Sequence, residues 1–147
     1  MPIVLRELRD GDVEVLDALQ RDEAVTRMAA VTARSSADFR AHLEKIRASP
    51  DVVFRVIELD GEVAGTMGSF VRGDRQLGYL IAPKFWGRGV ATRALELLLA
   101  IDRQRPMFAH VAVHNVGSRR VLEKCGFRVV ERRHEDDGVE VDVLRLG

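Results

Sequence analysis

The sequence predicts a mixed α/β (α+β) fold, with a sheet of about seven mostly antiparallel strands and helices on both of its faces. Three observations support this prediction. Apolar and polar residues alternate in short segments separated by turn signals, as in half-buried strands. A strongly amphipathic helical pattern at 89–103 lies between two such segments. A helix that connects two strands of one sheet makes them parallel, so we expect parallel fourth and fifth strands in an otherwise antiparallel sheet.

The first part of the chain combines one strand with helices. Residues 3–8 alternate apolar and polar side chains and predict a strand. Residues 10–12 offer an N-cap for a short amphipathic helix, and residues 22–30 are expected to be helical as well. Ser35 and Asp38 fit a capping box at the start of a third helix.

The remaining strands are marked by turn signals. Asp60 and Gly61 are typical of a two-residue hairpin turn, in which both positions need a positive φ. A last helix is expected to begin after Asn115, a good N-cap, and to run through Cys125, with Gly126 as its terminator. The strands of this part are expected at residues 52–59, 62–71, 76–82, 107–113, 127–132 and 139–146.

Composition excludes several classes of protein. A length of 147 residues suits one domain, so we expect 1–147 to form a single domain. Basic and acidic residues both number 23, which leaves no basic footprint for nucleic acid. No apolar run could cross a membrane and no signal-peptide core follows Met1, so a cytoplasmic location is expected. The single cysteine, Cys125, excludes an internal disulfide and a multi-cysteine metal site, and no metal is expected.

The most informative segment is 83–92, which leaves a strand and enters the amphipathic helix. Gly87 and Gly89 let the backbone approach a ligand, and the helix N-terminus adds N–H groups and partial positive charge, a combination that favours phosphate. A tight turn without a ligand is the structural alternative. A P-loop is excluded because Val90 and Ala91 stand where it needs lysine and serine or threonine. A dinucleotide-binding fold is excluded because its glycines would follow the first strand.

Two segments resemble the GNAT N-acetyltransferase superfamily. Residues 86–91, Trp-Gly-Arg-Gly-Val-Ala, are similar to its acyl-CoA pyrophosphate loop, although Trp86 stands where the family has Gln or Arg. This loop and residues 115–127, which begin Asn-Val-Gly-Ser and end Glu-Lys-Cys-Gly-Phe, resemble the branch of the ribosomal-protein N-terminal acetyltransferases. Gly78-Tyr79 and the hairpin at 60–65 also fit, so the resemblance covers nearly the whole chain.

The resemblance implies an acetyl-CoA site where the fourth and fifth strands splay apart. The pantetheine arm is expected to pair with the backbone of Leu80, Ile81 and Ala82, and one of these N–H groups would hold the developing oxyanion. Asn115 and Ser118 are expected to line the pantetheine and thiolate end. The pyrophosphate is expected at backbone N–H groups of the loop, helped by the Arg88 side chain, so this part of the site comprises Gly87, Arg88, Gly89, Val90, Ala91 and Thr92.

Catalytic groups are less clearly marked than the cofactor loop. Many relatives use a tyrosine of the last helix as general acid, and Leu122 stands there. Ser118 is the remaining hydroxyl, with helix capping or cofactor contact as its alternative role. The glutamate that relatives often carry before the Gly-Tyr pair is Gln76, which cannot accept a proton. His110 has a suitable intrinsic pKa, although a strand histidine is usually packed and hydrogen-bonded, and His114 is a weaker candidate. Ser118 and His110 are therefore the candidate catalytic residues.

The acceptor is expected to be a primary amine that attacks the thioester directly, so Cys125 is expected to be a packing residue. A lysine amine with a pKa near 10.4 is about 0.04% neutral at pH 7, whereas an α-amine near 7.7–8.0 is roughly 10–15% neutral. An α-amine therefore needs less help from a base, in agreement with the branch resemblance. We expect acetyl transfer from acetyl-CoA to a peptide or protein N-terminus, with a small-molecule amine left open.

Two other classes of function are left open. A non-catalytic acyl-CoA-binding or sensor domain would keep the loop and lack an acid and a base, which Gln76 and Leu122 favour. The other hypothesis, a protein-interaction module, is supported only by the expected sheet. The expected partners are acetyl-CoA and the amine acceptor, without nucleic acid or membrane, and the chain is expected to be a monomer or a homodimer.

Overall fold

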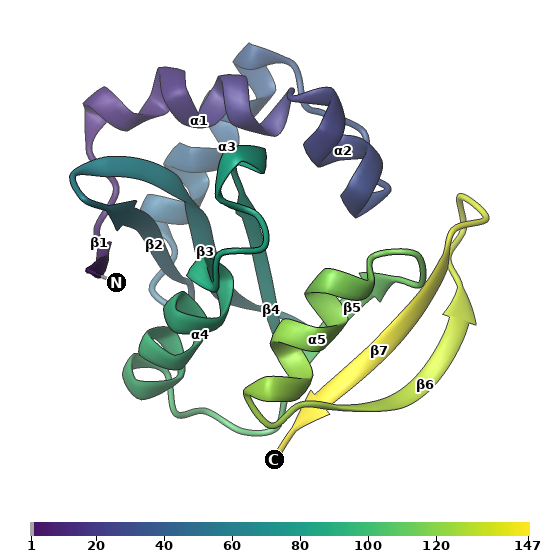
Figure 1. Cartoon of the computed structure of the whole chain (residues 1–147). Coiled ribbons are helices and arrows are strands. Elements are labelled where there is room, and N and C mark those ends of the chain that lie inside the picture. Colours follow the sequence, from purple (N-terminus) through teal and green to yellow (C-terminus); the bar gives the residue numbers. More distant parts are fainter. Residues whose placement is uncertain (1) are drawn as a thin grey trace.

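The computed structural model describes residues 2–147. Its centre is a seven-stranded sheet in the order β1-β2-β3-β4-β5-β7-β6 (Figure 1). Neighbouring strands are antiparallel except for β4 and β5, which are parallel. The predicted fold class is thereby confirmed. The strands are β1 (Ile3–Arg6), β2 (Val53–Leu59), β3 (Glu62–Arg72), β4 (Asp74–Ile81), β5 (Met107–Ala112), β6 (Arg128–His134) and β7 (Glu140–Leu146).

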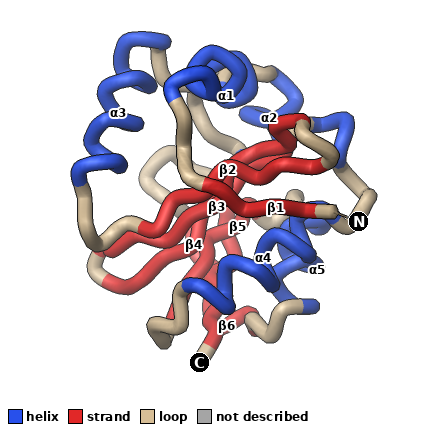
Figure 2. The backbone as a smooth tube through the Cα atoms, turned by 90° about the vertical axis from the view of Figure 1, so that its left-hand side faces the viewer, coloured by secondary structure: helices blue, strands red, loops and turns tan. Residues whose placement is uncertain are grey.

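The helices cover both faces of the sheet (Figure 2). On one face, α1 (Val13–Gln20), α2 (Glu23–Ala29) and α3 (Ser36–Ala48) pack over a small apolar core. On the other face, α4 (Val90–Ile101) and α5 (Val116–Lys124) pack over a larger core. Among residues 2–147, no helix is long and apolar enough to span a bilayer.

Local signals account for several element ends. Asp60 and Gly61 have φ of 52° and 78°, as the two-residue turn between β2 and β3 requires. The Asn115 side chain accepts a hydrogen bond of 3.2 Å from the first turn of α5 and caps this helix as predicted. Asp12 stands at the N-cap position of α1, within the predicted 10–12 segment, but its side chain makes no capping hydrogen bond to this helix. The Asp12 carboxylate instead accepts two hydrogen bonds of 2.8 Å from the Arg6 guanidinium and ties α1 to β1.

β4 and β5 pair only along a short stretch. Their register begins with Arg75 opposite Met107 and ends with Leu77 opposite Ala109. Beyond this point β4 stays paired with β3 up to Ile81, while β5 stays paired with β7. The two strands therefore draw apart, which leaves one edge of β4 open.

A buried polar network holds the paired end of these two strands. Arg75 is 8% exposed and donates a hydrogen bond of 2.9 Å to Ser69 on β3 and one of 3.0 Å to Asp102, which follows α4. Ser69 also donates a hydrogen bond to Asp102. This network joins β3, β4 and the end of α4 at the side opposite to the opening.

Candidate active site

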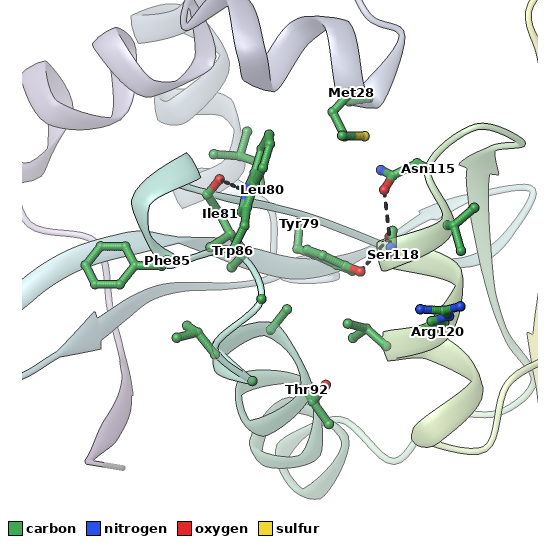
Figure 3. Close-up of a pocket in the computed structure, with 18 of the residues that line it drawn as sticks. Met28, Tyr79, Leu80, Ile81, Phe85, Trp86, Thr92, Asn115, Ser118 and Arg120 are labelled. Atoms are coloured by element: carbon green, nitrogen blue, oxygen red, sulfur yellow. Dashed lines mark hydrogen bonds between the residues drawn. The ribbon is translucent and has the colours of Figure 1, made fainter.

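A cavity of about 570 Å³ lies at the opening between β4 and β5. The lining includes the residues predicted to bind acetyl-CoA, except Ala82 and Arg88. Figure 3 shows the lining side chains, which come from β4, the following loop, α2, α4 and α5. The predicted residues that line the cavity are Leu80, Ile81, Gly87, Gly89, Val90, Ala91, Thr92, Asn115 and Ser118.

The loop after β4 is shaped for a bound anion. Gly87 and Gly89 have φ of 73° and 77°, a backbone conformation that side chains with a Cβ rarely adopt. Helix α4 begins directly afterwards at Val90, so its first N–H groups and its positive dipole end lie beside the cavity. The geometry of the loop therefore suits an anion at the place where the pyrophosphate was expected.

The contacts of the Trp86 side chain account for a tryptophan at a position where the family has Gln or Arg. Its indole Nε1–H donates a hydrogen bond of 2.8 Å to the backbone carbonyl of Ile81 (Figure 3). This bond ties the glycine loop back to the last residue of β4. The ring also forms part of the cavity wall. The side chain thus fixes where the loop leaves the strand, which positions the loop amides.

The backbone of β4 has one edge free and one edge bonded. The Ala82 N–H donates to the Ala64 carbonyl at 2.8 Å, and the Ala82 carbonyl accepts from Phe85 at 2.9 Å. Because bonded residues alternate along an antiparallel pair, Leu80 also faces β3, whereas Tyr79 and Ile81 face the opening. The expectation that Leu80 and Ala82 pair with the pantetheine arm therefore needs correction, since the backbone of Leu80 faces β3 and both backbone groups of Ala82 are already used. The open backbone edge belongs to Tyr79 and to the N–H of Ile81, because the Ile81 carbonyl already accepts the Trp86 hydrogen bond.

A pair of hydroxyl groups lies in the cavity. The Tyr79 hydroxyl and Ser118 Oγ are 2.5 Å apart, and they join β4 to the first turn of α5 (Figure 3). Burial raises the pKa of Tyr79 above its ordinary value, and the hydrogen bond with Ser118 opposes this shift only in part. The phenol is therefore protonated at neutral pH and can donate a proton.

Tyr79 is the candidate functional residue that sequence reasoning missed. The sequence marks it only as part of a family resemblance, without a role. The expected tyrosine position on α5 holds Leu122, which is fully buried in the larger core. The sequence did contain a signal that could have identified Tyr79. It is the single tyrosine of the chain, and it lies on a strand that was expected to line the cofactor.

His110 lies outside this cavity, so its predicted catalytic role is not supported by its position. Its Nδ1 is 3.3 Å from Arg133 and 3.5 Å from Glu135, on the side of the sheet edge formed by β6. His114 does line the cavity, and its Nε2 is 3.2 Å from the backbone carbonyl of Arg27. Gln76 does not line the cavity and bonds the Arg72 carbonyl.

The positive side chains of the cavity also differ from the prediction. Arg88 is not part of the cavity lining, and its guanidinium lies 5.4 Å from the centre of the Phe85 ring. Arg120 and Lys124, both on α5, line the cavity instead. Among the described residues, no aspartate or glutamate lines it. The cavity therefore favours a ligand with negative charge.

Cys125 has the environment of a packing residue. Its side chain is half-buried against the larger core, and its thiol lies 3.8 Å from the Thr92 carbonyl. Burial raises the pKa of the thiol, with a smaller contribution from Glu96. A thiol with a raised pKa is a poor nucleophile at neutral pH, and this one does not line the cavity.

A family model described as an acetyltransferase (GNAT) domain matches residues 3–128. The chain belongs to the GNAT acetyltransferase family. It is an N-acetyltransferase domain that uses acetyl-CoA as co-substrate, in agreement with the loop and the open strand edge. The match extends from β1 to the start of β6 and so includes every element around the cavity. A comparison with curated proteins found no match.

Solved structures show the same fold across nearly the whole chain. The spermidine N-acetyltransferase of Vibrio cholerae, solved with CoA and spermine, has a TM-score of 0.82 and 20% identity, covering 98% of this chain and 94% of that one. An acetyltransferase of Thermus thermophilus has a TM-score of 0.80 and 20% identity, covering 99% and 97%. The aminoglycoside acetyltransferase AAC(6')-Ib, solved with coenzyme A, has a TM-score of 0.77 and 23% identity, covering 97% and 94%.

These comparisons confirm the superfamily and leave its branch open. The neighbours include enzymes named for spermidine and for aminoglycosides. The resemblance to the ribosomal-protein N-terminal acetyltransferases stays a prediction, and so does the choice of an α-amine acceptor.

Proposed function

We propose that this GNAT acetyltransferase transfers the acetyl group directly from acetyl-CoA to a primary amine of low pKa, such as the α-amine of a peptide or protein N-terminus. The observation that carries the proposal is the meeting of three features in one cavity. The glycine loop, the open edge of β4 and the hydroxyl pair all line it. Both substrates would occupy the opening together, so no covalent intermediate on the protein is needed.

Different residues of the chain bind different parts of acetyl-CoA. The loop amides and the N-terminus of α4 hold the pyrophosphate, and Arg120 and Lys124 add positive charge on the facing side. The free backbone groups of Tyr79 and the free N–H of Ile81 orient the pantetheine arm and the thioester along β4. A backbone N–H on this edge stabilises the oxygen that gains negative charge when the amine attacks.

The hydroxyl pair supplies the proton for the departing sulfur. In the reaction a carbon–nitrogen bond forms and the carbon–sulfur bond breaks, so the sulfur leaves with an electron pair. Tyr79 is protonated at neutral pH and is bonded to Ser118, so one hydroxyl can donate a proton to the sulfur while the other passes its proton along the bond. The pair, now one proton short, regains that proton from water. The proton lost by the amine leaves through water. General acid assistance of this kind typically contributes about 10²–10⁴-fold in rate.

The electrostatics of the cavity favour an amine that is readily neutral. No carboxylate among the described lining residues stabilises an ammonium ion, while Arg120 and Lys124 disfavour one. An α-amine is roughly 10–15% neutral at pH 7, compared with about 0.04% for a lysine amine. This difference supports an α-amine over the side-chain amine of lysine.

Thiol release from acetyl-CoA tests the proposal against the sensor alternative. We expect release that depends on the added amine and that is faster with an alanine or leucine amide than with Nα-acetyl-lysine amide at equal concentration and pH 7. A sensor domain would bind acetyl-CoA and release no thiol above the buffer rate with any amine. Faster release with the lysine derivative would contradict the preference for low pKa and leave the transferase activity standing.

A further inference from the structure

A second cavity of about 350 Å³ lies between the sheet and the helices of the opposite face. Its walls come from α1, α2, α3, the segment between α2 and α3, and the strands β2, β3 and β4. Most of the lining side chains are apolar. They are Leu16, Val25, Ala29, Val31, Ala33, Phe39, Leu43, Ile46, Phe54 and Leu80.

The two cavities share a wall. Val25, Ala29, Tyr79 and Leu80 line both of them. Because Tyr79 also carries the hydroxyl that points toward Ser118 in the first cavity, the second cavity adjoins the place where the acetyl group would be transferred. Figure 3 shows the Tyr79 side chain pointing toward Ser118, with Leu80 farther along β4. A molecule that presents an amine at Tyr79 has this space for the rest of its body.

The polar groups of the second cavity carry no negative charge. Arg34, His42 and Tyr79 are the titratable residues among its described lining. The Gln20 amide is used within the protein, because it donates to the Arg34 carbonyl at 2.8 Å and accepts from the Arg34 N–H at 2.9 Å. Polycationic amines need carboxylates to replace their hydration, and this cavity offers a cation instead.

His42 does not change this balance of charge. Burial lowers the pKa of its ring, and Arg34, Lys45 and Arg72 lower it further. The ring is therefore largely neutral at pH 7. A neutral ring next to apolar side chains adds to the surface available for an apolar group without binding an ammonium ion.

We infer that the second cavity binds the side chain of the acceptor and selects an α-amine that carries a bulky apolar group and no second positive charge. This inference rests on the proposed function. Its volume lies in the range of small-molecule sites and accepts a leucine- or phenylalanine-sized group. Burial of such a group against the apolar lining supplies the preference, and Arg34 opposes a further cation.

A panel of amines on the wild-type protein gives the first test. Glycinamide and leucine amide share the α-amine and differ in the side chain, whereas spermidine is a polycation. We expect kcat/KM from thiol release to be at least about tenfold higher for leucine amide than for glycinamide, and lowest for spermidine. Equal values for the two amides, or a preference for spermidine, would overturn the inference.

Filling the cavity gives the second test. Ala33 lines the second cavity alone, so Ala33→Trp should lower kcat/KM for leucine amide by about tenfold or more and leave that for glycinamide and the Kd for acetyl-CoA unchanged. Ala37 is exposed on α3 outside both cavities, which makes Ala37→Trp the matched control with no expected effect. Leucine amide turnover that is unaffected by Ala33→Trp would contradict the assignment.

Charge reversal keeps the inference testable if the tryptophan variant does not fold. Arg34 is exposed and its bonds to Gln20 use its backbone, so Arg34→Glu should preserve the fold. We expect it to raise kcat/KM for spermidine by about fivefold or more. Arg40→Glu makes the same charge change on the exposed surface of α3 and should not raise it. An equal response of the two variants would overturn the inference.

Different results would contradict the proposed function and this inference. Binding of acetyl-CoA without thiol release from any amine would contradict the transferase proposal, and the inference with it. Thiol release from all α-amines at similar kcat/KM, unchanged by the cavity variants, would contradict the inference alone.

Discussion

Ser118 and Tyr79 are the two residues that we propose to act together in place of the tyrosine expected on α5. Leu122 fills the expected position and is part of the core, yet a phenol reaches the same cavity from β4. Its hydroxyl lies 2.5 Å from Ser118 Oγ. The candidate acid is therefore a bonded pair from two elements, and each member should matter mainly when the sulfur departs.

Ser118→Ala should lower kcat by about tenfold or more and change the Kd for acetyl-CoA by less than about threefold. The reason is that a hydrogen bond to the sulfur is strongest late in the reaction, when charge has developed there. Tyr79→Phe should have a similar effect, and the double variant should lose less than the product of the two. The measurements are kcat with saturating amine and calorimetric Kd. A fall in affinity with kcat unchanged would assign Ser118 to cofactor binding alone.

Lys124→Ala should weaken acetyl-CoA binding about threefold or more and should not weaken binding of acetyl-pantetheine, which lacks the pyrophosphate. Lys124 lines the cavity, and an exposed charge–phosphate contact is worth about 1 kcal/mol or less. Arg88→Ala is the matched comparison, because Arg88 lies against the Phe85 ring outside the lining, and it should have the smaller effect. Calorimetry with both ligands checks this, and a larger loss for Arg88→Ala would restore the sequence-based prediction.

At the scale of elements, the site depends on how the glycine loop leaves β4 and enters α4. The Trp86 bond to Ile81 sets the start of the loop, and the positive φ angles of Gly87 and Gly89 set its course. The paired end of β4 and β5 is held separately by the network of Arg75 with Asp102. The opening therefore has a fixed end and an open end, each set by different residues.

Gly89→Val should weaken acetyl-CoA binding severely while the protein stays folded. A branched Cβ at φ of 77° is strained, by about 1–2 kcal/mol, and stands beside the loop amides that would hold the pyrophosphate. Gly73→Val is the control, since Gly73 has φ of 74° in the turn between β3 and β4, outside the cavity. It should cost similar stability and leave the Kd unchanged. Equal affinity of Gly89→Val and wild type would rule out the loop as the pyrophosphate site.

Asp102→Asn should destabilise the fold by about 3–5 kcal/mol at pH 7, because it leaves the buried Arg75 without its counter-charge. Burial alone would raise the pKa of Asp102, but hydrogen bonds from Ser69, the Gln104 N–H and Arg75 outweigh it and lower the pKa. A lowered pKa contributes stability above the unfolded value of about 3.9, and this contribution is lost as the pH falls further.

Urea unfolding at several pH values checks this prediction. The difference in stability between wild type and Asp102→Asn should shrink as the pH falls below about 4. Asp10→Asn is the matched control, because Asp10 pairs with Arg47 while 96% exposed and should cost less than about 1 kcal/mol. A difference that stays constant down to acid pH would show that the carboxylate charge is not what stabilises the network.

Across the whole molecule, features set by neighbouring residues were predictable and features set by the sheet were not. The turn at Asp60 and the cap at Asn115 follow from local backbone needs, and the glycine loop follows from its place between a strand and a helix. The roles of Ala82 and Tyr79 depend on which edge of β4 faces β3. That edge is set by the register between the two strands, and the spacing of residues along the sequence does not predict this register.

His110 and Arg88 illustrate a second cause. The alternation of apolar and polar residues along a strand predicts which side chains share a face of the sheet. It does not predict which side chains of other elements they contact. His110 contacts Arg133 and Glu135 from β6 and the turn after it, segments that a strand order of β5-β7-β6 brings near although they are distant in the chain. The second cavity likewise needs α1, α3 and three strands to be placed together before any of its residues stands out.

The central claim is direct acetyl transfer to an amine in the cavity between β4 and β5, with both substrates bound together. Initial rates of thiol release, measured while acetyl-CoA and leucine amide are both varied, test it most directly. The account predicts amine-dependent release with intersecting double-reciprocal lines, because no acetyl group is held covalently by Cys125 or any other residue. Parallel lines, or no release above the buffer rate, would contradict it.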